Sequence, residues 1–152
     1  MIHAQKVREL VNSSKNAMVG LYRAFSYHLQ LFSNVSIDFF RDLDRLYSHI
    51  RHDYDRTHSH NQKQLQDYME RGVSEGVFRD DIDYQVHIAL LEFQMEALKR
   101  LEYNFPPNIT LPKAIEHINY SFLRAVATPK GLEMLEDAIQ SQNTFIEHDS
   151  DE

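Results

Sequence analysis

RGVSEGVFRDDID, the stretch from Arg71 to Asp83, reads as the end of one helix, a short turn and the start of another. Gly76 suits the left-handed conformation that closes a helix, because glycine has no Cβ to clash there. Val77 and Phe78 can fold back on the last helical turn as the apolar contact of such a cap. Acidic side chains then cap free N–H groups at the positive end of the next helix, and they are Asp80, Asp81 and Asp83.

A second boundary of this kind lies nearer the end of the chain, in LRAVATPKGL from Leu123 to Leu132. Thr128 is a good N-cap and Pro129 suits the first helical position. Ahead of it, the two prolines of Asn104–Asn108 predict a loop, and a helix should restart near Thr110 or Leu111.

Elsewhere the apolar residues recur with helical spacing. This predicts one continuous first helix from near Met1 to Phe32, a short helix ending near Tyr47, and a long helix over 48–74, with 57–61 as a candidate break. The helix after the opening turn is apolar on most sides and is expected to be central. We therefore predict an all-α fold, a single helical bundle domain of about six helices.

The composition of the chain excludes several kinds of site and partner. The chain has 152 residues, 42% of them hydrophobic and 26% charged, which fits one globular domain with an adequate core. It has no cysteine, which excludes disulfides, thiol catalysis and thiolate metal sites. No apolar run approaches the ~18 residues of a membrane span, so a cytoplasmic protein without membrane contact is expected. The formal net charge of −7 repels a phosphate backbone, so this chain alone is not expected to bind nucleic acid.

Enzymatic motifs are missing from the sequence. It has no glycine-rich phosphate loop and no Gly-x-Ser-x-Gly elbow, and no glutamate has a histidine three residues later, as a di-iron bundle would need. We therefore expect neither an enzyme nor a cofactor. One dense set of potential metal ligands exists, for which a solvated helix face is favoured over a metal site: His49, His52, Asp53, Asp55, His58 and His60.

The two boundary motifs, Gly72–Asp83 and Leu123–Leu132, resemble those of TetR-family transcriptional regulators in spelling, separation and helix order. The resemblance covers roughly Val35 to Ile139 and departs from the family at Ala125, where members commonly carry glycine. The extra methyl group there alters how closely the helix can pack.

The resemblance implies that residues 1–147 are an effector-binding and dimerisation domain. Within it, residues 1–33 would be a remnant of the helix that links to an N-terminal helix-turn-helix, which this chain lacks, and DNA would be bound only through that head. The uncapped start at Met1 fits such a cut, and a frayed helix end is the alternative. Residues 148–152 are expected to be an acidic, disordered tail.

The resemblance also implies an effector pocket among the first helices and the central one, for a small, partly apolar molecule. Aromatic side chains with a few polar groups suit such a site, although ordinary core is the favoured alternative for each single residue. The candidates are Tyr22, Phe25, Phe39, Phe40, Tyr47, Tyr68, Met69, His87, Leu91, Gln94 and Met95.

By the same resemblance, the last two helices would pair with their copies in a four-helix interface of a homodimer. The candidates for this interface, for which monomer core is the alternative, are Ile115, Ile118, Phe122, Leu132, Leu135 and Ile139. The expected function is ligand sensing that controls DNA binding through helix shifts. The alternative function is a helical protein-interaction scaffold that binds no small molecule.

Overall fold

A computed structural model describes residues 2–33, 51–99 and 106–148 of the chain. Its six helices are α1 (Ile2–Asn12), α2 (Ala17–Ser33), α4 (Arg51–Ser74), α5 (Tyr84–Lys99), α6 (Leu111–Val126) and α7 (Pro129–His148). In these residues the regular structure is helical apart from one isolated bridge between Phe78 and Ala127. The predicted all-α helical domain is therefore confirmed.

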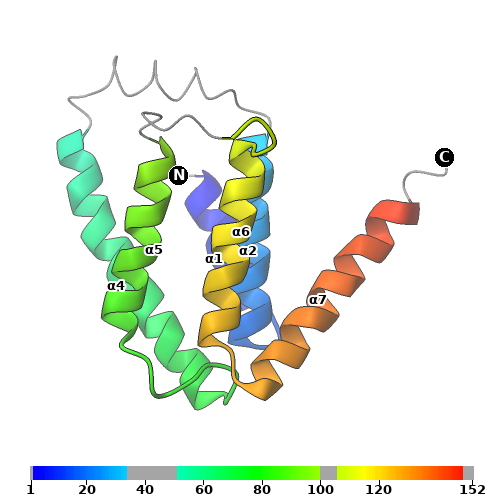
Figure 1. Cartoon of the computed structure of the whole chain (residues 1–152). Helices are drawn as coiled ribbons and strands as arrows, with labels where there is room; N and C mark the ends of the chain where they lie inside the picture. Colours follow the sequence, from blue (N-terminus) through cyan, green and yellow to red (C-terminus); the bar gives the residue numbers. More distant parts are fainter. Residues whose placement is uncertain (1, 34–50, 100–105, 149–152) are drawn as a thin grey trace.

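The bundle is built around α2, which packs against α1, α4, α6 and α7. Figure 1 shows α7 leaving the bundle at an angle, so that its C-terminal end points away from the other helices. The core contains fully buried side chains from α2, α4, α6 and α7, among them Met18, Met69, Leu123 and Leu135. No helix of the described residues is long and apolar enough to cross a lipid bilayer.

The prediction that the helix after the turn is central was wrong. Its neighbours are α4 and α6, and they bury one face of α5, including Ile88 and Leu91. The side chains of Val86, Leu90 and Phe93 are 54%, 54% and 72% exposed. Among the described residues, a helix with apolar residues on most sides therefore leaves some of them exposed.

The prediction of one continuous first helix was also wrong, because the chain turns between Asn12 and Ala17. Asn16 caps α2, since its Oδ1 accepts a hydrogen bond from the N–H of Val19 at 3.0 Å. The hydroxyl of Ser14 donates to the carbonyl of Leu10 in the last turn of α1 at 2.5 Å. Such side chains form hydrogen bonds with the backbone that replace those of a helix. The spacing of apolar residues carries no information about these bonds.

Other expected boundaries are found where the sequence placed them. Thr110 caps α6 by accepting a hydrogen bond from the N–H of Lys113 at 3.4 Å, with Pro112 in the first turn. The long helix is unbroken from Arg51 to Ser74, without the candidate break over 57–61. The short helix expected to end near Tyr47 lies outside the described residues.

Candidate functional site

The two boundary motifs dock directly on each other. The N–H of Thr128 donates to the carbonyl of Val77 at 3.1 Å, and the N–H of Arg79 donates to the carbonyl of Val126 at 2.8 Å. The hydroxyl of Thr128 adds a bond to the carbonyl of Gly76 at 2.7 Å. The turn before α5 and the turn before α7 therefore form one hydrogen-bonded joint, which we call the docked turns (residues 75–79 and 126–131).

The turn after α4 has the predicted geometry. Gly76 has φ +72°, in the left-handed region, and the N–H groups of Val77 and Phe78 both bond to the carbonyl of Gly72 at 3.0 Å. Val77 and Phe78 are each 1% exposed, as expected for side chains that fold back on the helix. A Cβ placed on Gly72 would lie 1.9 Å from the ring of Phe78, so glycine makes room for that ring.

The start of α7 is also as predicted. Thr128 is its N-cap, because its Oγ1 accepts from the N–H of Gly131 at 3.0 Å and its carbonyl accepts from the N–H of Leu132 at 2.8 Å. Gly131 is buried, and a Cβ there would lie 1.9 Å from the carbonyl oxygen of Val77. The absence of a side chain at Gly131 thus permits the close approach of the two turns.

Two of the acidic residues after the turn, Asp81 and Asp83, have different roles. Asp83 caps α5, since its Oδ1 accepts from the N–H of Val86 at 3.2 Å. Asp81 instead receives two hydrogen bonds from the guanidinium of Arg79, at 2.9 and 2.7 Å, so its predicted capping role was wrong. The hydrogen bond from Arg79 holds the pKa of Asp81 below its ordinary value.

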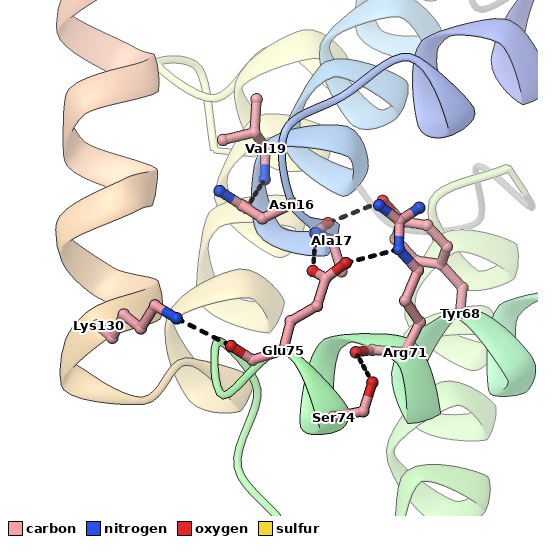
Figure 2. Close-up of polar contacts among 8 residues, drawn as sticks. All are labelled: Asn16, Ala17, Val19, Tyr68, Arg71, Ser74, Glu75 and Lys130. Carbon is pink, nitrogen blue, oxygen red and sulfur yellow. Dashed lines mark hydrogen bonds and ion pairs between the residues drawn. The ribbon is translucent and has the colours of Figure 1, made fainter.

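Glu75 joins three helices at one point, shown in Figure 2. Its carboxylate accepts from the backbone N–H of Ala17 at 2.6 Å and from Nε of Arg71 at 2.7 Å, while its own carbonyl accepts from Nζ of Lys130 at 3.0 Å. A carboxylate at the first turn of α2 also lies at the positive end of that helix. Glu75 therefore ties the start of α2 to the end of α4 and the start of α7.

Tyr68 also binds Ala17, at its carbonyl group rather than at its N–H. Its hydroxyl donates to the carbonyl of Ala17 at 3.0 Å, and burial raises the pKa of Tyr68 to about 12. The guanidinium of Arg71 lies 5.6 Å from the centre of the Tyr68 ring. Sequence reasoning missed this contact set because Ala17 and Glu75 are 58 residues apart and neither has a local signal.

Two predicted effector residues, His87 of α5 and Phe25 of α2, have their rings next to that of Phe122. The His87 and Phe122 rings are 4.9 Å apart, and those of Phe25 and Phe122 are 6.0 Å apart and edge to face. Nε2 of His87 is buried without a hydrogen-bond partner among the described residues, and burial lowers the pKa of His87. Phe122 had been predicted at the dimer interface instead.

The remaining effector candidates are dispersed. Tyr22, Met69 and Leu91 are buried in the core, and Met95 packs against it. Tyr68 contacts Ala17 and Gln94 is exposed, whereas three aromatic candidates lie outside the described residues: Phe39, Phe40 and Tyr47.

A small pocket opens between α2 and α6. Its cavity volume is about 20 Å³, little more than the ~10–15 Å³ that one water molecule needs. Tyr22 and Phe25 are the predicted residues in it. The full lining is Tyr22, Phe25, Ser26, Leu29, Glu116, Asn119, Tyr120 and Leu123.

The predicted dimer residues have unequal access to a partner. Ile115, Phe122 and Leu135 are buried in the core of the single chain, which corrects their expected place in an interface. Leu132 is 40% exposed, while Ile118 and Ile139 are partly buried against the core.

The histidine cluster over 49–60 lies outside the side chains that the structure describes. Among the side chains that are described, no three potential metal ligands come together.

His87 gives a pH dependence that can be measured. Its pKa in the fold lies below the ordinary 6.5, so below about pH 6.5 the unfolded chain binds more protons and stability is lost as pH falls. We expect the free energy of unfolding to fall less between pH 7.5 and 5.5 in His87→Phe than in the wild type. Urea unfolding at both values measures this, with the exposed His117→Asn as control. Equal losses in all three proteins would contradict it.

No model of a protein family matches the chain, and no curated protein or solved structure shows significant similarity to it.

Proposed function

We propose that this chain is the ligand-sensing and dimerisation domain of a TetR-like transcriptional regulator, and that it controls DNA binding by a head outside this chain. The observation that supports the proposal best is the docked turns. The motifs that carry the resemblance are 52 residues apart between Gly76 and Thr128, yet they hydrogen-bond to each other. The resemblance of both motifs to the TetR family then concerns one structural joint rather than two unrelated helix boundaries.

The proposed mechanism is a shift between two arrangements of the helices, driven by an effector that binds one of them more tightly. Glu75 supports such a mechanism because it links the N-terminal end of α2 to the docked turns. A displacement of α4 or α7 would move the hydrogen bond between Glu75 and Ala17 at the start of α2. Because α1 packs against α2, it would move as well. Under the proposal, α1 is the helix that leads toward the DNA-binding head.

Dimerisation is proposed through the exposed stripe of α5, defined as Val86, Leu90 and Phe93. These side chains follow one face of the helix at the spacing i, i+4, i+7 and are more than half exposed. Contiguous exposed apolar residues mark interaction sites, and a self-complementary patch gives a twofold dimer. On the neighbouring α6, the exposed Ser121 and Ala125 are small enough to allow close approach of a partner helix. This moves the proposed interface from the last two helices to α5 and α6.

The reading frame upstream of Met1 tests the regulator proposal. We expect it to encode a basic segment with three helices, the second and third forming a helix-turn-helix. The reason is that a sensing domain with a net charge of −7 needs a separate basic surface to bind DNA. An upstream frame without any helix-turn-helix would contradict the proposal.

The rival function is a scaffold domain without a small ligand. A thermal-shift screen of amphipathic and apolar compounds separates the two, because a ligand that binds the folded state stabilises it by about 2.7 kcal/mol at one hundred times its Kd. For a chain of this length, that is a rise in Tm of roughly 5–10 °C. The sensing proposal expects at least one such compound, and a screen with none would favour the scaffold.

A further inference from the structure

We propose that protonation of His87 loosens α5 from α6 and thereby weakens the proposed dimer, so that the interface contains its own pH-sensitive switch. The switch rests on the proposed function, since it acts on the dimer proposed there. Three features of the fold support it: the buried nitrogen of the His87 ring, the absence of a compensating charge, and the place of the ring between the two helices of the interface.

The His87 ring lies where a proton is not stabilised. Its Nε2 is buried and has no hydrogen-bond partner among the described residues. The ring centre lies 4.9 Å from that of Phe122 on α6. A neutral imidazole has one acceptor nitrogen, whereas a protonated ring donates from both nitrogens and carries a charge. Because a buried charge without a partner is costly, the protonated ring favours an arrangement in which water reaches it.

No nearby charge compensates for a proton on His87. Burial is the only cause of the lowered pKa of His87, so neighbouring charges do not act on it. The carboxylate of Asp83 caps α5 and accepts from the N–H of Val86. His87 also lies in the first turn of α5, where the positive end of the helix disfavours a cation. The other titratable side chains described on the packed helices are Lys63, Asp67, Tyr68, Glu70 and Arg71 of α4, Tyr84, Glu92 and Glu96 of α5, and Lys113, Glu116, His117, Tyr120 and Arg124 of α6.

The ring of His87 joins the two helices that form the proposed interface. In the sequence His87 follows Val86 of the exposed stripe, and Phe122 follows Ser121 of α6. The helices against which α5 packs most are α4 and α6. Because the proposed surface combines the α5 stripe with Ser121 and Ala125, a change in the spacing of α5 and α6 would alter its shape. Loss of the contact between His87 and Phe122 would permit such a change.

The expected pH dependence is opposite to that of the overall charge. Two chains of net charge −7 repel each other less as pH approaches the isoelectric point of about 5.7, so the overall charge alone would tighten the dimer. His87 acts in the other direction. Its pKa in the packed state lies below the ordinary 6.5, so below about pH 6.5 the loosened state binds more protons and the dimer is lost as pH falls.

Sedimentation equilibrium of the full chain at pH 7.5 and 5.5 tests the switch. We expect the Kd of the wild-type dimer to rise about fivefold or more at pH 5.5, because one proton is taken up by each chain on loosening. His87→Phe keeps a ring beside Phe122 but cannot be protonated, so its dimer should not weaken. The exposed His117→Asn should behave as the wild type. Circular dichroism at both pH values should show folded helices in all three proteins.

NMR titration of His87 in the unsubstituted site is the second measurement, because replacement of a packed ring could unfold the chain. Coupling between proton binding and dimerisation is reciprocal. The pKa of His87 should therefore be lower in the wild-type dimer than in Phe93→Glu, whose charge in the α5 stripe keeps it monomeric.

Three results would overturn the switch and leave the dimer standing: an equal or tighter wild-type dimer at pH 5.5, an equal weakening in His87→Phe, or the same pKa of His87 in the wild type and Phe93→Glu. A wild-type chain that is monomeric at pH 7.5 would instead overturn the proposed dimer, and the switch with it. An upstream frame without a helix-turn-helix would remove the regulator but not a pH-dependent dimer.

Discussion

Replacing Phe78 with alanine is expected to reduce the free energy of unfolding by about 3–5 kcal/mol. The ring is 1% exposed and occupies the space that a side chain at Gly72 would take. Removal of the ring therefore costs both its buried apolar surface and the cavity left between α4 and the docked turns. Since whole domains are stable by only about 5–15 kcal/mol, this loss is a large fraction of the total.

Urea unfolding followed by circular dichroism measures this loss. Ile109→Ala is the control, because Ile109 is 43% exposed in the loop before α6 and should cost below about 1 kcal/mol. If the two variants lost the same amount, Phe78 would not be the anchor of the turn.

Gly131→Ala should have the second large effect, a loss of about 3 kcal/mol. The added Cβ would lie 1.9 Å from the carbonyl oxygen of Val77, which is backbone that also accepts the N–H of Thr128. The atoms in contact are not a flexible side chain, so the docked turns must separate to admit the methyl group.

Gly76→Ala is the matched comparison for Gly131→Ala. Gly76 has φ +72° with no atom near its missing Cβ, so alanine there meets strain but no clash. Its cost should be about 1–2 kcal/mol. Thermal unfolding of both variants shows which one loses more stability. A larger loss of stability for Gly76→Ala would contradict the close approach at Gly131.

The parts of the fold that sequence predicted are those set by neighbouring residues. Gly76, Asp83, Thr110 and Thr128 each cap a helix through backbone groups within four residues, so their roles can be read locally. The turn between α1 and α2 was missed for the opposite reason. The apolar spacing continues across Asn16 in the same register, and the hydrogen bonds that end α1 come from small polar side chains.

The candidate site was less predictable, because long-range packing decides which face of a helix is covered. Leu90 and Leu91 are adjacent leucines in α5, yet one is 54% exposed and the other 8%. Phe122 lies in the core against His87, although its helical spacing also suited an interface. Glu75 illustrates the same limit, since its contact with Ala17 exists only in the folded chain.

The central claim, a sensing domain that works as a homodimer, is tested most directly by sedimentation equilibrium of the full chain and of Phe93→Glu. The proposal predicts a mass twice the 18.0 kDa of one chain for the wild type and 18.0 kDa for Phe93→Glu. A charge at Phe93, the most exposed residue of the α5 stripe, would be buried without a partner in the dimer. Gln85→Glu, an exposed site on the same helix, should remain dimeric. A wild-type mass of 18.0 kDa at micromolar concentration would contradict the claim.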